Sequence, residues 1–158
     1  MSSSTDAEAQ RRVSERYKLL RDQKQFTQGQ PINSVFSVSE KTLWLIKSVD
    51  AVLGNSPFPE FFKRPVSAYL EEITDALLRV GGNQCAEQFT KAIEVFAPDL
   101  AFERNAEFME IGKARERRAE NLSEDEIEQL DACYDRFFDS VESEELMSKL
   151  EQYLREAN

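Results

Sequence analysis

Residues 123–141 read SEDEIEQLDACYDRFFDSV and contain a clear helix signal. Ser123, followed three positions later by Glu126, forms a capping box, in which each side chain hydrogen-bonds the backbone N–H of the other residue. Apolar side chains then recur every three or four positions, which is the spacing of one helix face: Ile127, Leu130, Tyr134, Phe137, Phe138 and Val141. The stretch therefore predicts an amphipathic helix that turns this apolar face toward a core.

The same period extends over most of the chain, and the alternation typical of strands is almost absent. Ser37 with Glu40 forms a second capping box, whereas residues 26–38 are predicted to be a loop. Helices are predicted over residues 6–25, 37–53, 65–80, 85–96, 99–119, 123–141 and 143–154. The sequence therefore predicts an all-α fold, a single compact domain of about seven helices. Within it, residues 1–38 form an N-terminal polar helix and loop, and residues 39–158 form a helical domain with acidic C-terminal helices.

The composition argues against the common kinds of active site. The 158 residues include no histidine, so the commonest general base and metal ligand is missing. The two cysteines, Cys85 and Cys133, form neither a CxxC motif nor a zinc-binding spacing, and we expect two small buried thiols. The sequence therefore predicts a protein that is not an enzyme and that binds no cofactor and no metal. A pair of catalytic carboxylates stays open as an alternative, because such pairs are defined by their separation in space.

Three further patterns each have a structural and a functional interpretation. The aromatic side chains Trp44, Phe58, Phe61 and Phe62 are expected in the core rather than in a ligand pocket. The basic run from Lys113 to Arg118 is expected on a solvated helix face, or paired with the acidic end, rather than on nucleic acid. The repeat Asp131, Asp135, Asp139 lacks the alternating oxygen ligands and the glycine of a calcium-binding loop, so a solvated face is favoured there as well.

The N-terminus has neither the basic region nor the apolar region of a secretory signal. The longest uninterrupted apolar run is Leu43-Trp44-Leu45-Ile46, far below the ~20 residues that span a membrane. We therefore expect a cytoplasmic protein without a membrane segment.

The negative charge is concentrated at the C-terminal end. The net charge of the chain is −10. Residues 1–119 carry 17 acidic and 17 basic side chains, whereas residues 120–158 carry 13 acidic and three basic ones. Because affinity for phosphate backbones comes from lysine and arginine, this balance disfavours direct nucleic-acid binding and favours a basic protein partner.

The acidic side chains of the helix after Ser123 share one side. At 100° per residue, five of them fall within about 80° of one another on the solvent side: Glu124, Glu128, Asp131, Asp135 and Asp139. Like charges at these spacings cost a few tenths of a kcal/mol per pair. A sequence selected for stability alone would more often intersperse lysine. We predict a partner-binding surface on these five residues, extended by Glu142 and Glu145, with a merely solvated face as the alternative.

The order of elements resembles the bacterial DNA-mimic protein family. Residues 52–62, VLGNSPFPEFF, resemble the family's block of hydrophobic residues, Asn/Gly turn and Phe-x-x-Phe-Phe, although Ser56-Pro57 replaces a Gly-Gly. The helix end at Phe96-Ala97-Pro98 and the block Leu130-Asp131-x-x-Tyr134 are also similar, and the resemblance covers roughly residues 40–157. It implies a small acidic helical protein involved in transcription regulation. Such proteins present carboxylates in place of DNA phosphates to the DNA-binding face of a transcription factor. The alternative function is an immunity-type or inhibitory protein that caps a basic toxin or enzyme.

Charge density limits what one helix can imitate. Five carboxylates spread over about 22 Å of helix give one charge per ~5 Å, against one per ~3.4 Å for a DNA strand. The expected sources of further charge are a second copy in a homodimer, or the acids near the last helix: Glu142, Glu144, Glu145 and Glu151. Residues 6–25 carry six basic and four acidic side chains, and this segment is expected to contact the acidic end, in the same chain or in a dimer mate.

Overall fold

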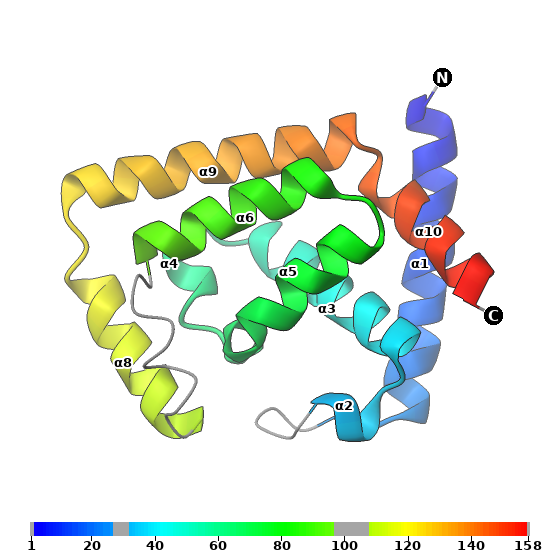
Figure 1. The fold of residues 1–158 in the computed structure, drawn as a ribbon, viewed down its shortest axis with the longest axis horizontal. Helices are drawn as coiled ribbons and strands as arrows, with labels where there is room; N and C mark the ends of the chain where they lie inside the picture. The colour runs from blue at the N-terminus through cyan, green and yellow to red at the C-terminus, as the bar shows by residue number, and fades with distance from the viewer. Residues whose placement is uncertain (1, 27–31, 97–107, 158) are drawn as a thin grey trace.

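The computed structural model describes residues 2–26, 32–96 and 108–157, and every regular element in these ranges is helical (Figure 1). The predicted all-α fold is confirmed. Helix α9 (Glu124–Ser143) and helix α6 (Asn83–Phe96) lie side by side. The other elements are α1 (Ser2–Gln23), α2 (Ile32–Val35), α3 (Val38–Leu53), α4 (Phe58–Phe61), the 3-10 helix η1 (Pro65–Tyr69), α5 (Leu70–Arg79), α8 (Phe108–Glu120) and α10 (Leu146–Ala157).

An aromatic cluster forms the centre of the core. Phe58, Phe61 and Phe62 of the short α4 region are fully buried. Phe62 stacks on Phe96 at the end of α6, with ring centroids 4.3 Å apart. Trp44 of α3 is also buried, so these four aromatic side chains belong to the core, as the sequence favoured. Burying such rings, at roughly 1.5–3 kcal/mol for a Phe, anchors α4 beneath α6 and α9.

The N-terminal helix packs against the C-terminal one. In Figure 1, α1 and α10 lie against each other at one end of the molecule, and α1 also contacts α3. Val13 and Leu20 of α1 are buried in the common core. Arg12 forms an ion pair with Glu151 of α10, and the Oδ1 of Asp6 accepts a hydrogen bond of 2.9 Å from the hydroxyl of Ser148. The predicted contact between residues 6–25 and the acidic end is therefore made within one chain.

Three local predictions were wrong. The expected loop over residues 26–38 contains the one-turn helix α2, whose Ile32 is buried; residues 27–31 lie outside the described ranges. The helix expected over residues 65–80 divides into η1 and α5. The backbone N–H of Ser67 donates to the carbonyl of Arg64, three residues earlier, which is the 3-10 pattern, and the Ser67 hydroxyl donates to the carbonyl of Phe62. The last helix begins at Leu146, because α9 continues through Ser143.

The helix predicted over residues 99–119 is observed as α8 from Phe108, and residues 97–107 lie outside the described part of the chain. None of the helices within residues 2–26, 32–96 and 108–157 is both long and apolar enough to span a membrane.

Candidate functional site: the acidic face of α9

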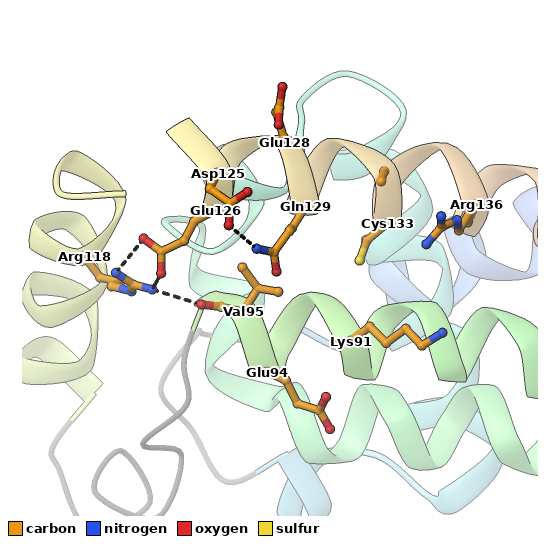
Figure 2. Close-up of a pocket in the computed structure, with 11 residues that line it drawn as sticks. Lys91, Glu94, Val95, Arg118, Asp125, Glu126, Glu128, Gln129, Cys133 and Arg136 are labelled. Carbon is orange, nitrogen blue, oxygen red and sulfur yellow. Dashed lines mark hydrogen bonds and ion pairs between the residues drawn. The ribbon is translucent and has the colours of Figure 1, made fainter. Parts of the chain in front are cut away.

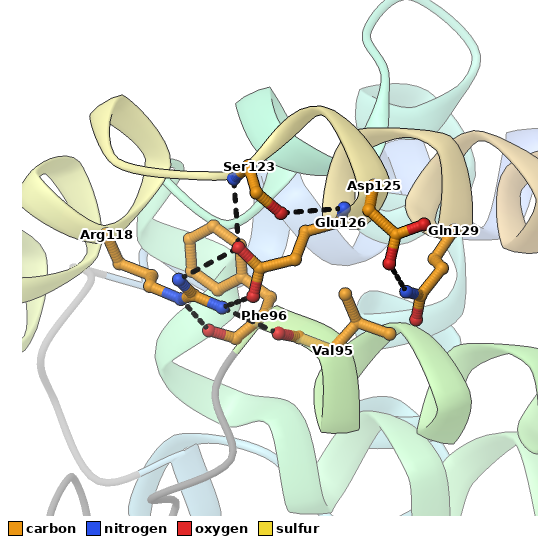
Figure 3. Close-up of polar contacts among 7 residues, drawn as sticks. All are labelled: Val95, Phe96, Arg118, Ser123, Asp125, Glu126 and Gln129. Atoms are coloured by element: carbon orange, nitrogen blue, oxygen red, sulfur yellow. Dashed lines mark hydrogen bonds and ion pairs between the residues drawn. The ribbon is translucent and has the colours of Figure 1, made fainter.

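The start of α9 is fixed by its capping box, as the sequence predicted. The hydroxyl of Ser123 accepts a hydrogen bond of 3.1 Å from the backbone N–H of Glu126, and the Glu126 carboxylate accepts one of 2.9 Å from the N–H of Ser123 (Figure 3). This cap satisfies two N–H groups that a helix end would otherwise leave free. Because it sets the first turn, it also sets which side chains of α9 point outward.

The structure places six of the seven predicted partner-binding residues on α9 with exposed side chains: Glu124, Glu128, Asp131, Asp135, Asp139 and Glu142. We call these six residues the acidic row. The opposite side of α9 buries Leu130, Cys133 and Phe137. The seventh residue, Glu145, is half-buried in the connection to α10 and has a φ of 51°, so it lies apart from the row.

The sequence predicted that Ile127 would face the core, but the structure leaves Ile127 41% exposed. It lies at the edge of the apolar face of α9, one helical turn from Asp131 of the acidic row. Tyr134 and Phe138, on the same edge, are half-buried and contact each other with ring centroids 5.0 Å apart. The acidic row is therefore bordered on one side by partly exposed apolar side chains.

Glu126 is half-buried, and its negative charge is paired within the chain. Arg118 of α8 forms an ion pair with its carboxylate and donates hydrogen bonds of 2.8 and 2.9 Å to the carbonyl oxygens of Phe96 and Val95 (Figure 3). The Arg118 guanidinium, with the backbone N–H of Ser123, lowers the pKa of Glu126 to about 2. One arginine thus joins the end of α8, the end of α6 and the start of α9.

Glu144 caps another helix. Its carboxylate oxygens accept hydrogen bonds of 3.0 and 2.9 Å from the backbone N–H groups of Gln84 and Cys85, in the first turn of α6. Partial burial would raise the pKa of Glu144, but these two N–H groups outweigh it and lower the pKa below its usual range. A carboxylate at a helix N-terminus also interacts favourably with the helix dipole. Glu144 therefore holds α6 in place rather than presenting charge to a partner.

Glu151 is the third acid with an internal role. Its side chain is only 8% exposed and pairs with Arg12, while Arg155 approaches it to 3.3 Å. Hydrogen bonding from Arg12 lowers the pKa of Glu151, against the effect of burial. The expectation that Glu144 and Glu151 add to the acidic row was therefore wrong, because both carboxylates are used to join helices.

The basic run of α8 also has a structural role. Arg115 is buried and donates to the carbonyl and the hydroxyl of Ser67, which joins α8 to η1. Arg118 pairs with Glu126, whereas Lys113 and Arg117 are exposed. The prediction of pairing with the acidic end is confirmed for Arg118.

A groove of about 780 Å³ lies between α6 and α9 (Figure 2). At 100° per residue along α9, the groove residues Gln129 and Arg136 lie on the other side of the acidic row from Ile127. Lys91 and Glu94 line it from α6, and Gln129, Cys133 and Arg136 line it from α9. Cys133 and Cys85 are both free and buried. Burial raises the pKa of each thiol, so both thiols are protonated at neutral pH. Sequence reasoning missed the groove, because it is formed by two helices whose pairing the periodicity does not specify.

Within residues 2–26, 32–96 and 108–157, no three or more His, Cys, Asp and Glu side chains gather in an arrangement that would hold a metal ion. Asp131, Asp135 and Asp139 are each exposed on the outward side of α9.

The comparison with protein families identifies the relatives of this all-helical chain. A family model described as DMP19-like protein matches residues 35–157. The chain belongs to the DMP19-like family. This membership confirms the resemblance to DNA-mimic proteins and makes the chain a protein of the DNA-mimic type. No curated protein and no solved structure matches it.

The DMP19-like match begins at Val35, the last residue of α2, and extends through α10. It therefore includes α9 with the acidic row, and the groove between α6 and α9. Helix α1, which supplies Arg12 to Glu151, precedes the matched residues.

Proposed function

We propose that the acidic row of α9 binds the basic DNA-binding surface of a protein partner, such as a transcription factor, in place of DNA. One observation carries the proposal: some acids of the C-terminal end are tied to other helices, and six others share one exposed side of α9. Glu126, Glu144 and Glu151 are held by internal partners, whereas the six residues of the acidic row are all exposed on one side of a single helix.

The dimensions of α9 are compatible with imitation of one DNA strand. Eighteen residue steps separate the ends of the acidic row, which corresponds to about 27 Å of helix. A strand carries about eight phosphates over that length, against the six carboxylates of the row. The row thus approaches the charge density of one strand but not that of a duplex.

A concentrated negative surface has a kinetic and a thermodynamic effect on a basic partner. It steers the partner during diffusion, which raises the association rate by roughly 10–1000-fold at low salt. The attraction is screened over about 10 Å at 0.1 M salt, so the affinity is expected to fall as the salt concentration rises.

The proposal is tested by capture of partners from a native lysate, followed by titration of the captured protein. The variant reverses three charges of the row: Glu128→Lys, Asp131→Lys and Asp135→Lys. The control reverses three exposed acids on α1 and α5: Glu15→Lys, Asp22→Lys and Asp75→Lys. Both change the net charge from −10 to −4, and both sets of side chains are exposed, so both proteins are expected to fold.

We expect the captured protein to bind wild type and control alike, to bind the α9 variant roughly tenfold or more weakly, and to be released by duplex DNA. Equal affinity for the two reversed proteins would overturn the assignment to the acidic row, as would the failure of wild type to retain any protein. A partner that depends on the row but is not displaced by DNA would support the alternative function, capping of a basic toxin or enzyme.

A further inference from the structure

Two cations lie at one end of the groove between α6 and α9. Figure 2 shows Lys91 on α6 and Arg136 on α9, with Cys133 beside them, and all three line the groove. Both side chains are exposed, and both positive charges act on the Cys133 thiol, where they oppose the effect of burial on its pKa. The two cations therefore belong to one small region, next to the acidic row.

Arg136 is unusual in its own helix. The sequence of α9 contains eight acidic residues and only this one basic residue. Relief of repulsion along a helix requires an opposite charge three or four positions away. For Arg136 those positions are Ala132, Cys133, Asp139 and Ser140, so only one of them is acidic. Support of its own helix is therefore a weak explanation for this arginine.

Lys91 has a weak partner of its own. Its ammonium group lies 3.5 Å from a carboxylate oxygen of Glu87, one turn earlier on α6. The two side chains are 47% and 60% exposed, so this pair contributes only ~0–1 kcal/mol. Such a pair leaves the ammonium group able to contact an incoming acidic group.

Cations beside the acidic row let the surface discriminate between basic partners, which phosphates alone cannot do. A surface made only of acids attracts any protein with a basic DNA-binding face. A cation on that surface repels lysine and arginine but attracts a carboxylate, so it separates partners by a difference in affinity. DNA itself offers no positive group at this place.

We propose that Lys91 and Arg136 determine the specificity of this DNA mimic by binding a carboxylate that the cognate partner carries beside its basic surface. The inference rests on the proposed function of the acidic row. The partner is thus a basic protein with an aspartate or glutamate next to its phosphate-binding residues, seated at the groove between α6 and α9.

The test asks whether a more negative surface beside the acidic row weakens or strengthens binding of the partner. The double variant Lys91→Glu, Arg136→Glu makes the surface beside the row more negative. The control Arg11→Glu, Lys18→Glu makes the same change in net charge at two exposed positions of α1. Each is titrated with the captured partner that duplex DNA releases, and with a short oligolysine peptide whose C-terminus is amidated and which therefore has no carboxylate.

We expect the groove variant to bind the captured partner roughly tenfold or more weakly than wild type does, although its surface is more acidic. It is expected to bind oligolysine at least as tightly as wild type does, and the α1 control is expected to keep its affinity for the partner. Restoration of binding when one acidic residue of the partner is replaced by lysine would identify the carboxylate.

If the groove variant binds the captured partner as tightly as wild type or more tightly, the specificity role of Lys91 and Arg136 is overturned. That result leaves the proposed function intact so long as Glu128→Lys, Asp131→Lys, Asp135→Lys still weakens binding roughly tenfold or more. Loss of both partner and oligolysine binding in the groove variant would also overturn the inference, because it would indicate a disturbed surface rather than a missing carboxylate contact.

Discussion

Glu144→Ala is expected to destabilise the fold through α6, a helix that is about 60 positions away in sequence. In wild type, the Glu144 carboxylate accepts the N–H groups of Gln84 and Cys85. After truncation, the N–H of the exposed Gln84 can bond water, whereas the buried Cys85 is expected to lose its partner. An unsatisfied buried N–H costs about 1–3 kcal/mol, and loss of a helix cap costs typically ~1 kcal/mol.

These contributions overlap, so we expect the free energy of unfolding to fall by about 2 kcal/mol. For a chain of this size that corresponds to about 4–8 °C in Tm. The measurement is urea denaturation followed by circular dichroism, with a thermal melt as a second readout. The matched control is Glu142→Ala, which removes an exposed carboxylate near the same end of α9 and is expected to change the stability by less than about 0.5 kcal/mol.

The effect of pH on this contact has a defined sign. The pKa of Glu144 is lower in the folded protein than its unperturbed value of 4.5. Its contribution is therefore fully present above the unfolded pKa and is lost as the pH falls through the folded one. The stability difference between wild type and Glu144→Gln should shrink as the pH is lowered below 4.5. An equal loss in Glu144→Ala and Glu142→Ala, or a difference that does not depend on pH, would refute the capping role.

Three other changes have defined outcomes. Arg118→Lys should lower the free energy of unfolding by about 1–2 kcal/mol in urea, because an ammonium group cannot reach Glu126 and two carbonyl oxygens together; a neutral result would contradict this. Glu145→Gly should raise the stability by up to about 1 kcal/mol in a thermal melt, since glycine adopts a positive φ without strain. Val13→Ala should lower the free energy of unfolding by about 2 kcal/mol, because Val13 is buried in the common core, whereas the exposed Lys18→Ala should leave it unchanged.

The sequence by itself determined the all-α class, the start of α9 and the outward direction of the acidic row, because these depend on residues at most four positions apart. The capping box of Ser123 and Glu126 needs only the first turn of α9, and the outward direction of Glu128 or Asp135 follows from 100° per residue. The burial of the aromatic block near Phe58 was also predictable, since large apolar rings have no better place than the core.

Only the tertiary structure decided which acids remain available to a partner. Glu144 and Glu151 look like the other carboxylates in the sequence, yet one caps α6 and the other pairs with Arg12 of α1. Their partners lie 59 and 139 positions away, and local periodicity carries no information on such distances. The exposure of Ile127 and the groove that brings Lys91 next to Arg136 depend in the same way on how α6 packs against α9. Helix geometry sets the spacing of the acidic side chains along α9. Whether an acidic side chain pairs within the protein or stays free for a partner depends on which other helices pack beside it.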